Sequence, residues 1–574
     1  MKKSLALLSS FILAVSLFTG VFAQEAKNSQ TTSKNSKEIT APAKPNKPVT
    51  IETIEADVAE ALTLIESNHV NGKKLNYNDV FKTAADSMLH SLDPHSNYFD
   101  AKEFEQFRTD QNSRYYGIGA TIGDLRDAKG DVVATFIKAT FENAPANRAG
   151  LRYGDKIIEV NGTSMLGKPF SEVREFLRGP RGTAAKLVVE RYGTGKREAV
   201  EIIRDAVSQP SIAEAYMVRP GIGYIGMTGG FNYTTYNEFR EAMQQLKAQG
   251  MQQLVLDLRN NGGGLVNQAY QVANTFLKSG QTVFTQKGRV EGAARSFAAD
   301  NPSPDNTPIV VLVNRSTASA SEILAGALQD HDRALIVGET TFGKGLVQNP
   351  FVFPEYGSML LLTIAKYETP SGRLIQRDYS NGSLYDYYSN GGSFEDENKP
   401  VQPKGEEKRT ASGRVVYSGG GINPDVAIKA RTITSERARF QRKLNDPLFA
   451  FALDVAYGKA KGFETLKIDR PITFEYDIKT GDFRVDETIF QAFKKYAVEK
   501  YNFTPAQIDR EREFVERTLR TELVTAAYGT TTSYQVFNDY DDQLLRAIEL
   551  LPEAKQLAIR GAKASAEKLG QTNR

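Results

Sequence analysis

Apolar side chains recur at spacings that change along the chain, and the changes mark out regions of different structure. Between residues 51 and 91 they recur three and four positions apart, which predicts amphipathic helix. Residues 115–205 instead alternate in short runs divided by glycines, which predicts β-strands. Residues 24–48 are rich in Ser, Thr, Lys, Asn and Pro and contain almost no bulky apolar side chain, as in a solvated, disordered linker.

The middle of the chain alternates between strand and helix patterns. Short apolar runs predict strands at Gly223–Gly226, Leu254–Leu258, Pro308–Val313, Ala334–Val337 and Met359–Ile364. Helical spacing predicts helices at Tyr236–Gln249 and from Glu322 onward, an order typical of a sheet covered by helices. After residue 430 charged amphipathic helix dominates, with one hairpin predicted from Ile472–Asp477 and Asp482–Val485.

These patterns predict a multidomain α+β protein. Its regions are a signal peptide (1–23), a disordered linker (24–48), an N-terminal helical region (49–112), a β-domain (113–206), an α/β core (207–430) and a mostly helical C-terminal region (431–574).

The signal peptide is predicted from Lys2 and Lys3, a largely apolar stretch over residues 5–17, and the small-x-small ending Val21-Phe22-Ala23. An uncleaved membrane anchor is the alternative, but the apolar stretch is shorter than the roughly 20 residues that a span needs. We therefore expect an exported protein with no stable membrane span after cleavage. A periplasm fits best, and secretion stays open.

Composition limits the chemistry that this chain can perform. The 574 residues include 72 basic and 69 acidic ones, for a net charge of +3, so no nucleic-acid partner is indicated. The chain has no cysteine. Disulfides, a cysteine nucleophile and thiolate metal sites are therefore excluded.

Ser319 stands at a predicted strand-to-helix turn. Such a turn exposes a hydroxyl at a helix N-terminus, where free N–H groups and the helix dipole favour developing negative charge. The run Ser319-Ala320-Ser321-Glu322 also matches the S-x-x-E capping box, which only starts a helix. From this segment alone, both interpretations stay open.

A serine nucleophile needs a base. The chain has four histidines: His69, His90, His95 and His331. His331 follows Ser319 by a helix length of about 18 Å and the others precede the β-domain, so a Ser-His-Asp triad is not expected. Lys344 can serve instead where burial keeps it neutral. Its segment, Gly338–Gly345, also matches the start of a P-loop, but Gly345 replaces the usual Ser or Thr and a strand pattern follows.

Two motifs together resemble the C-terminal processing (tail-specific) peptidases of the S41 family. They are Val313–Asp330, which contains Ser-Thr-Ala-Ser-Ala-Ser-Glu, and Gly338–Gln348, which contains Phe-Gly-Lys-Gly. The resemblance covers roughly residues 50–430. It implies that Ser319 is the nucleophile, that Lys344 is the base and that Gln348 orients the lysine.

The run Asp257-Leu258-Arg259-Asn260-Asn261-Gly262-Gly263-Gly264 is similar to the glycine loop of the same family. The similarity implies an oxyanion hole made by the N–H groups of Gly263 and Ala320. Gly262 stands where the family pattern often has proline, which leaves the donating glycine open by one position. A plain turn is the alternative. Three further matches, Leu92–Ser96, Tyr367–Arg373 and Gly421–Asp425, are interpreted as structural.

The predicted β-domain resembles a PDZ domain in the turn, strand and turn of Gly154–Gly162 and in the final strand Leu187–Arg191. PDZ domains capture extended peptides at a sheet edge. The resemblance implies that the loop Tyr116-Gly117-Ile118-Gly119 receives a terminal carboxylate. A small β-domain without a ligand is the alternative.

Together these features predict an exported serine endopeptidase that cleaves proteins near or from their C-terminal tails, with no metal or cofactor. Expected partners are unfolded proteins or proteins with exposed C-termini, and an adaptor or a homo-oligomer stays open. The alternatives are a non-catalytic peptide-binding scaffold and, less well supported, a nucleotide hydrolase.

Overall fold

The computed structural model describes residues 49–380, 384–389, 405–468 and 470–572. The predicted signal peptide and linker lie outside these residues. The chain divides after Asn76 into two units, which we describe separately. The first contains α2 (Ile51–Asn68), as predicted, and the short 3-10 helix η1 (Gly72–Lys74). Thr50 caps α2 by accepting the N–H of Thr53.

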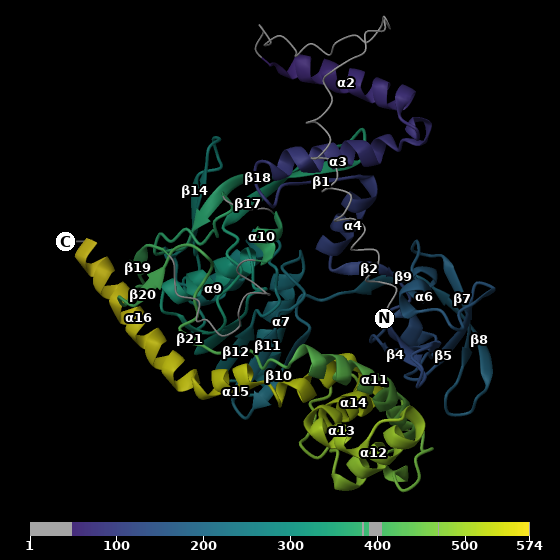
Figure 1. The fold of residues 1–574 in the computed structure, drawn as a ribbon. Coiled ribbons are helices and arrows are strands. Elements are labelled where there is room, and N and C mark those ends of the chain that lie inside the picture. Colours follow the sequence, from purple (N-terminus) through teal and green to yellow (C-terminus); the bar gives the residue numbers. More distant parts are fainter. Residues whose placement is uncertain (1–48, 381–383, 390–404, 469, 573–574) are drawn as a thin grey trace, which may run out of the picture. The chain divides into compact units, whose positions relative to one another are not determined.

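A six-stranded sheet forms the core of the second unit (Figure 1). Its order is β10-β11-β12-β15-β16-β21, and all neighbours are parallel except β10 and β11. The strands are β10 (Glu214–Arg219), β11 (Ile222–Gly226), β12 (Gln253–Asp257), β15 (Ile309–Val313), β16 (Ala334–Gly338) and β21 (Val426–Ala427). The predicted α/β core is confirmed.

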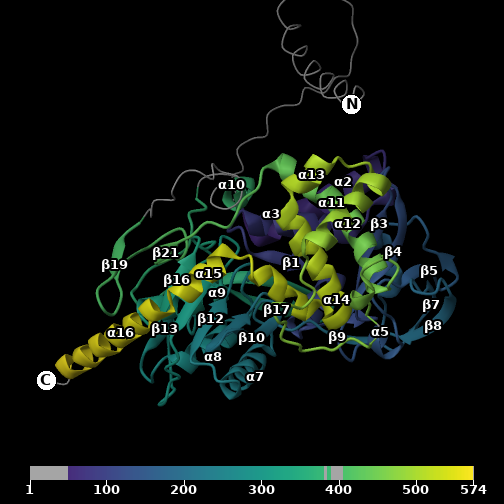
Figure 2. The ribbon, with the colours of Figure 1, turned by 90° about the horizontal axis from the view of Figure 1, so that it is seen from below.

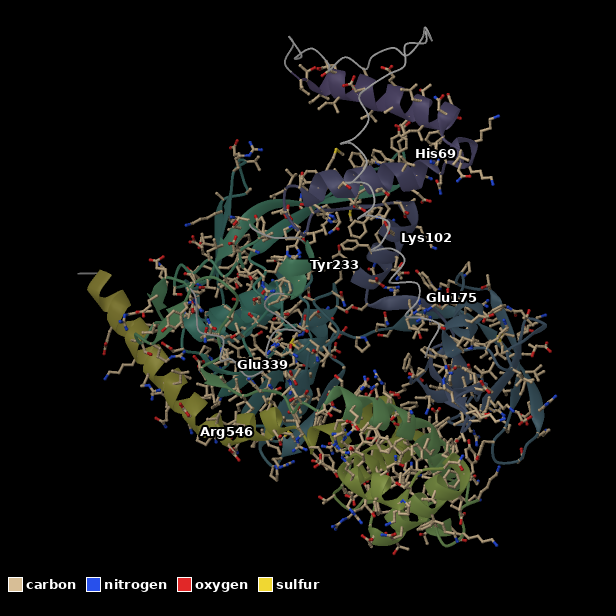
Figure 3. All side chains as sticks on the ribbon, in the orientation of Figure 1. His69, Lys102, Glu175, Tyr233, Glu339 and Arg546 are labelled. Atoms are coloured by element: carbon tan, nitrogen blue, oxygen red, sulfur yellow. The ribbon has the colours of Figure 1, made fainter. Side chains whose placement is uncertain are left out.

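Helices cover both faces of this sheet. Successive residues of a strand point to opposite sides, and the central strands are apolar on both sides, so each face needs a cover. The helices of the first face are α7 (Thr235–Ala248), α8 (Val266–Phe276) and α9 (Ala320–Asp330), and those of the second are α15 (Asp542–Glu549) and α16 (Leu551–Thr572). Leu256 packs on the first face and Val255 on the second. Figures 1 and 2 show α15 and α16 (yellow) running along the sheet. Leu544 of α15 is buried against the sheet, whereas Arg546, labelled in Figure 3, is exposed.

A second, antiparallel sheet has the order β1-β18-β13-β14, and β17 also pairs with β18. Its strands are β1 (Asn97–Phe99), β13 (Thr282–Gly288), β14 (Arg295–Ala298), β17 (Leu346–Phe353) and β18 (Ser358–Glu368). The helices α3 (Tyr77–His90) and α4 (Ala101–Gln111) flank β1 along the chain. The N-terminal region is helical, as predicted, apart from β1, which is too short to show alternation and finds its partner, β18, far along the chain.

The β-domain is built on a sheet of order β3-β4-β5-β7-β8, with β6 paired to β5 and β3 at the edge. Its elements are β3 (Ala120–Arg126), β4 (Val132–Thr140), α5 (Pro145–Arg148), β5 (Lys156–Val160), β6 (Thr163–Ser164), α6 (Phe170–Leu177), β7 (Ala184–Glu190) and β8 (Arg197–Ile203). A separate ribbon pairs β2 (Arg114–Gly117) with β9 (Asp205–Ser208). Tyr116 and Gly117 therefore lie in a strand and not in the predicted loop. Only Ile118, whose side chain is buried in the domain core, and Gly119 join β2 to β3.

The helices that follow residue 430 share a core with the β-domain. They are α11 (Ser435–Ala456), α12 (Glu487–Tyr501), α13 (Pro505–Arg510) and α14 (Arg512–Asn538). Phe136 of β4 packs edge-on against Phe449 of α11. Glu522 of α14 binds both Lys138 of β4, at 3.2 Å, and the hydroxyl of Tyr153, at 2.8 Å. The C-terminal region thus contacts the β-domain through α11 and α14 and the central sheet through α15 and α16.

The predicted hairpin at residues 472–485 was wrong, because no strand is present there. Its apolar side chains pack on α14 instead: Phe474 lies against Gly529, where φ is +86° and the helix is kinked. The segment also bonds to α14 through the N–H of Thr473 and the carbonyl of Ala527, at 3.1 Å. Between residues 49 and 572, leaving aside the gaps stated above, no helix combines the length and apolar character that crossing a membrane requires.

Candidate active site

Ser319 lies at the turn between β15 and α9, as its sequence position predicted. It is the N-cap residue of α9, with φ of 58° and ψ of −118°, and its side chain is half-buried. A positive φ is costly for a residue with a side chain and is over-represented at functional sites. Ser319 is therefore the N-cap of α9, as the capping-box interpretation predicted. Its positive φ, however, is not needed to cap a helix.

Glu322 joins the nucleophile turn to the lysine loop. Its fully buried carboxylate accepts the backbone N–H groups of Ser319 and Lys344 at one oxygen, both at 2.8 Å. The other oxygen accepts the N–H of Gly343 at 2.7 Å and the hydroxyl of Thr341 at 2.5 Å. Burial raises the pKa of Glu322, and these donors oppose the rise. From the sequence, Glu322 was interpreted only as the second residue of the S-x-x-E capping box.

Lys344 lies in the loop between β16 and β17, and its Nζ donates to Oε1 of Gln348 at 2.7 Å. Burial lowers the pKa of Lys344, and the negative charges of Asp93 and Glu322 work against this shift. The strand β17 follows the loop directly, which removes the P-loop alternative because a P-loop needs a helix there. Lys344 and Gln348 are therefore brought together as the resemblance implied.

The turn Leu92–Ser96, interpreted from the sequence as purely structural, lies at this site. The carbonyl of His95 accepts a hydrogen bond from Nε2 of Gln348. Burial lowers the pKa of His95 to about 3, and the nearby positive charge of Lys344 contributes. The carboxylate of Asp93 holds the turn by accepting the N–H groups of His95 and Ser96, at 2.8 and 2.9 Å. The match of this turn to the peptidase family was the signal that could have placed it here.

The glycine loop approaches Ser319 so closely that only glycine fits at position 263. A Cβ on Gly263 would lie 2.7 Å from Cβ of Ser319 and 2.9 Å from the backbone N of Ala320, and φ there is +95°. The two predicted oxyanion donors are thus adjacent. The N–H of Gly263 already donates to Oδ1 of Asn261, at 2.9 Å, so it would have to exchange this partner to bind an oxyanion.

The remaining predicted residues lie elsewhere or play no part in these contacts. Nε2 of His331, beyond the far end of α9, lies 2.7 Å from the carbonyl oxygen of Thr282. Ile118 and Gly119 belong to the β-domain, where a Cβ on Gly119 would lie 2.3 Å from that of Ala144. Within the described ranges, no cluster of three or more His, Asp or Glu side chains is arranged to hold a metal ion.

Comparison of the sequence with known proteins places this chain in a family. Residues 221–387 match the model of peptidase family S41, and residues 137–191 match that of the PDZ domain. Over 301 residues the chain is 35% identical to a carboxy-terminal-processing protease of Bartonella bacilliformis, covering 52% of this chain and 67% of that protein. Over 318 residues it is 34% identical to a carboxyl-terminal-processing protease of Synechocystis, covering 55% and 72%. The chain belongs to peptidase family S41.

The match to family S41 contains every predicted active-site residue of this S41 peptidase: Ser319, Lys344, Gln348, Gly263 and Ala320. The four predicted residues of the carboxylate loop precede the segment matched by the PDZ model. Among solved structures, the chain is 27% identical to a photosystem II D1 C-terminal processing protease, covering 66% of this chain and 94% of that one with a TM-score of 0.33. Membership of family S41 rests on the sequence relatives and on the family model. The protein is therefore a protease.

Proposed function

We propose that this protease is a serine endopeptidase that uses a Ser319–Lys344 pair to cut proteins near or from their C-terminal tails. The observation that carries the proposal is the shared carboxylate oxygen of Glu322, which accepts the N–H groups of both residues. The lowered pKa of Lys344 supports its role as a base, because a neutral amine has the lone pair that proton transfer needs. The names of the curated relatives support the action on C-terminal tails.

The proposed reaction has two halves. Nζ of Lys344 takes the proton of Oγ of Ser319, Oγ bonds to the substrate carbonyl carbon, and the N–H groups of Gly263 and Ala320 stabilise the oxyanion. Protonated Lys344 then gives its proton to the leaving amine, and the C–N bond breaks. Water, deprotonated by Lys344, releases the acyl group from Ser319. Gln348 holds Nζ, and the carbonyl of His95 fixes which end of the Gln348 amide faces it.

Tail capture is proposed at the edge strand β3 of the PDZ domain. An extended tail would add beside β3, next to α6, with its carboxylate at the N–H groups of the Ile118–Gly119 connection. A fluorescent peptide with a free C-terminus should bind at least about tenfold more tightly than its amidated form, because the amide lacks the charge that these N–H groups select. Equal affinities for the two peptides would remove this part of the proposal.

Activity tests the catalytic pair directly. Ser319→Ala and Lys344→Ala should each abolish cleavage of an unfolded test protein. Ser316→Ala, an exposed serine of the same turn, serves as the matched control and should keep full activity. Undiminished cleavage by either catalytic variant would overturn the proposal. A wild-type protein that cleaves no test substrate would instead favour a non-catalytic peptide-binding scaffold.

Export through residues 1–23 is part of the same proposal, and it rests on the sequence pattern alone. N-terminal sequencing of the protein recovered from the extracytoplasmic fraction of a bacterial host should give Gln24 as the first residue. Recovery only as the full-length chain would contradict it.

A further inference from the structure

We propose that Arg259 and Asp541 are positioning residues that hold the glycine loop against Ser319, with helix α15 as the anchor. The inference rests on the proposed function, since it concerns the oxyanion hole of that reaction. It gives the C-terminal region, whose sequence lies outside the S41 match, a part in catalysis.

The guanidinium of Arg259 is largely buried and divides its bonds between two elements. Its Nε binds both carboxylate oxygens of Asp257, at the end of β12, each at 3.0 Å. Its Nη2 lies 2.6 Å from Oδ2 of Asp541, and its Nη1 donates to Oε1 of Gln543 at 2.9 Å. Nη2 also donates to Oδ2 of Asp257, at 2.5 Å, so this one nitrogen joins the end of β12 to the N-terminus of α15. A guanidinium suits this arrangement because its donors form a rigid planar fork.

The N-terminus of α15 is itself firmly held. Asp541 caps the helix by accepting the N–H groups of Gln543 and Leu544 at Oδ1, at 3.0 and 3.1 Å. Nε2 of Gln543 donates to the carbonyl of Ile428 at 2.7 Å, and the side chain of Leu544 is buried under the central sheet. An anchor that is fixed by three independent contacts can fix the group that binds it.

Contacts then run without a gap from Arg259 to the nucleophile. The next residue, Asn260, exchanges hydrogen bonds with Asn314, at 3.0 and 2.9 Å, in the loop that leads to Ser319. Asn261 accepts the N–H of Gly263, which packs against Ser319. A shift of Arg259 therefore moves the predicted donor Gly263, and displacements of about 1 Å can cost about 100-fold in rate.

Asp541→Asn separates this role from simple stability. The Asn side chain keeps Oδ1, which caps α15, and replaces Oδ2, which binds Arg259, with an NH₂ group that cannot accept. We expect kcat for a quenched fluorescent peptide to fall about tenfold with KM within about twofold, a smaller loss than the removal of an oxyanion donor causes. The Ki of a matching peptide aldehyde, which adds to Oγ of Ser319 and places an oxygen in the same hole, should rise by the same factor.

The neighbouring carboxylate supplies the control. Asp542 is exposed and binds Arg431 at the surface, so Asp542→Asn should keep the wild-type kcat, Ki and melting temperature. Wild-type kcat in Asp541→Asn would overturn the inference, and so would a loss of kcat that only follows a loss of folded protein in a thermal melt. Failure of the proposed function itself would appear separately, as activity that survives Ser319→Ala.

Discussion

Glu322→Gln is the substitution that most directly tests how the site is built. The carboxylate accepts four hydrogen bonds, two at each oxygen, from the nucleophile turn and the lysine loop. An amide keeps one oxygen and turns the other into a donor that faces two donors. The side chain is too buried for water to replace the lost acceptor.

The magnitude follows from those contacts. Each hydrogen bond to a charged group contributes about 1.5–3 kcal/mol, so the loss of two destabilises the site by about 3–6 kcal/mol. That is a large fraction of the total stability of a domain, about 5–15 kcal/mol. Either the turn and the lysine loop separate, or the core loses stability. We expect kcat/KM to fall at least about 100-fold, with a lower melting temperature by calorimetry.

Glu339→Gln is the matched control. This carboxylate, labelled in Figure 3, precedes the same loop, and its ion pair with Arg315 is long, at 3.7 Å. Its removal should cost less than about 1 kcal/mol and leave kcat/KM near the wild-type value. If Glu322→Gln behaved like Glu339→Gln in both assays, Glu322 would not hold the two loops together.

Three further predictions use other contacts of the described residues. In Asp93→Asn, the rise of kcat/KM with increasing pH should occur at lower pH. The charge of Asp93 raises the pKa of Lys344, so removing the charge lowers that pKa and lets neutral lysine form at lower pH. A shift to higher pH would refute the role of neutral Lys344 as the base. Gly263→Ala should reduce kcat by about 100-fold or more in a folded protein, whereas Gly262→Ala, where an added Cβ meets nothing within 4 Å, should be nearly neutral; equal effects would argue against Gly263 as the donor. Glu522→Ala should destabilise the contact between the PDZ domain and the C-terminal helices by about 2 kcal/mol, because Lys138 and Tyr153 lose their partner, while Glu499→Ala, in an exposed pair with Lys495, should not; calorimetry that showed no difference between the two would count against a shared core.

The parts of the fold that depend on local pattern could be predicted from the sequence. The central strands are buried on both faces and therefore read as continuous apolar runs, as in β15 and β16. The turn at Ser319 follows from a strand, a small polar run and a helix start. The placement of Lys344 beside it came from the family resemblance, because nothing local links two residues in separate loops.

Contacts between distant segments could not be predicted. The turn at His95 carries no pattern that points to Gln348, and the charged helices after residue 430 do not reveal which of their apolar stripes meets the PDZ domain and which meets the sheet. The alternation near Ile472 and Phe483 resembled a hairpin, yet both side chains find their partners on helices, which overrides a weak strand preference.

The cover supplied by α15 and α16 also sets an order of events during synthesis. A nascent chain leaves the ribosome from its N-terminus, so the strands that carry Val255 and Val310 emerge long before Leu544 and Leu557, which bury them. Until then one face of that sheet is an open apolar surface of the kind that binds chaperones or aggregates. A chain that ends before α15 is therefore expected to keep this apolar face exposed and to aggregate.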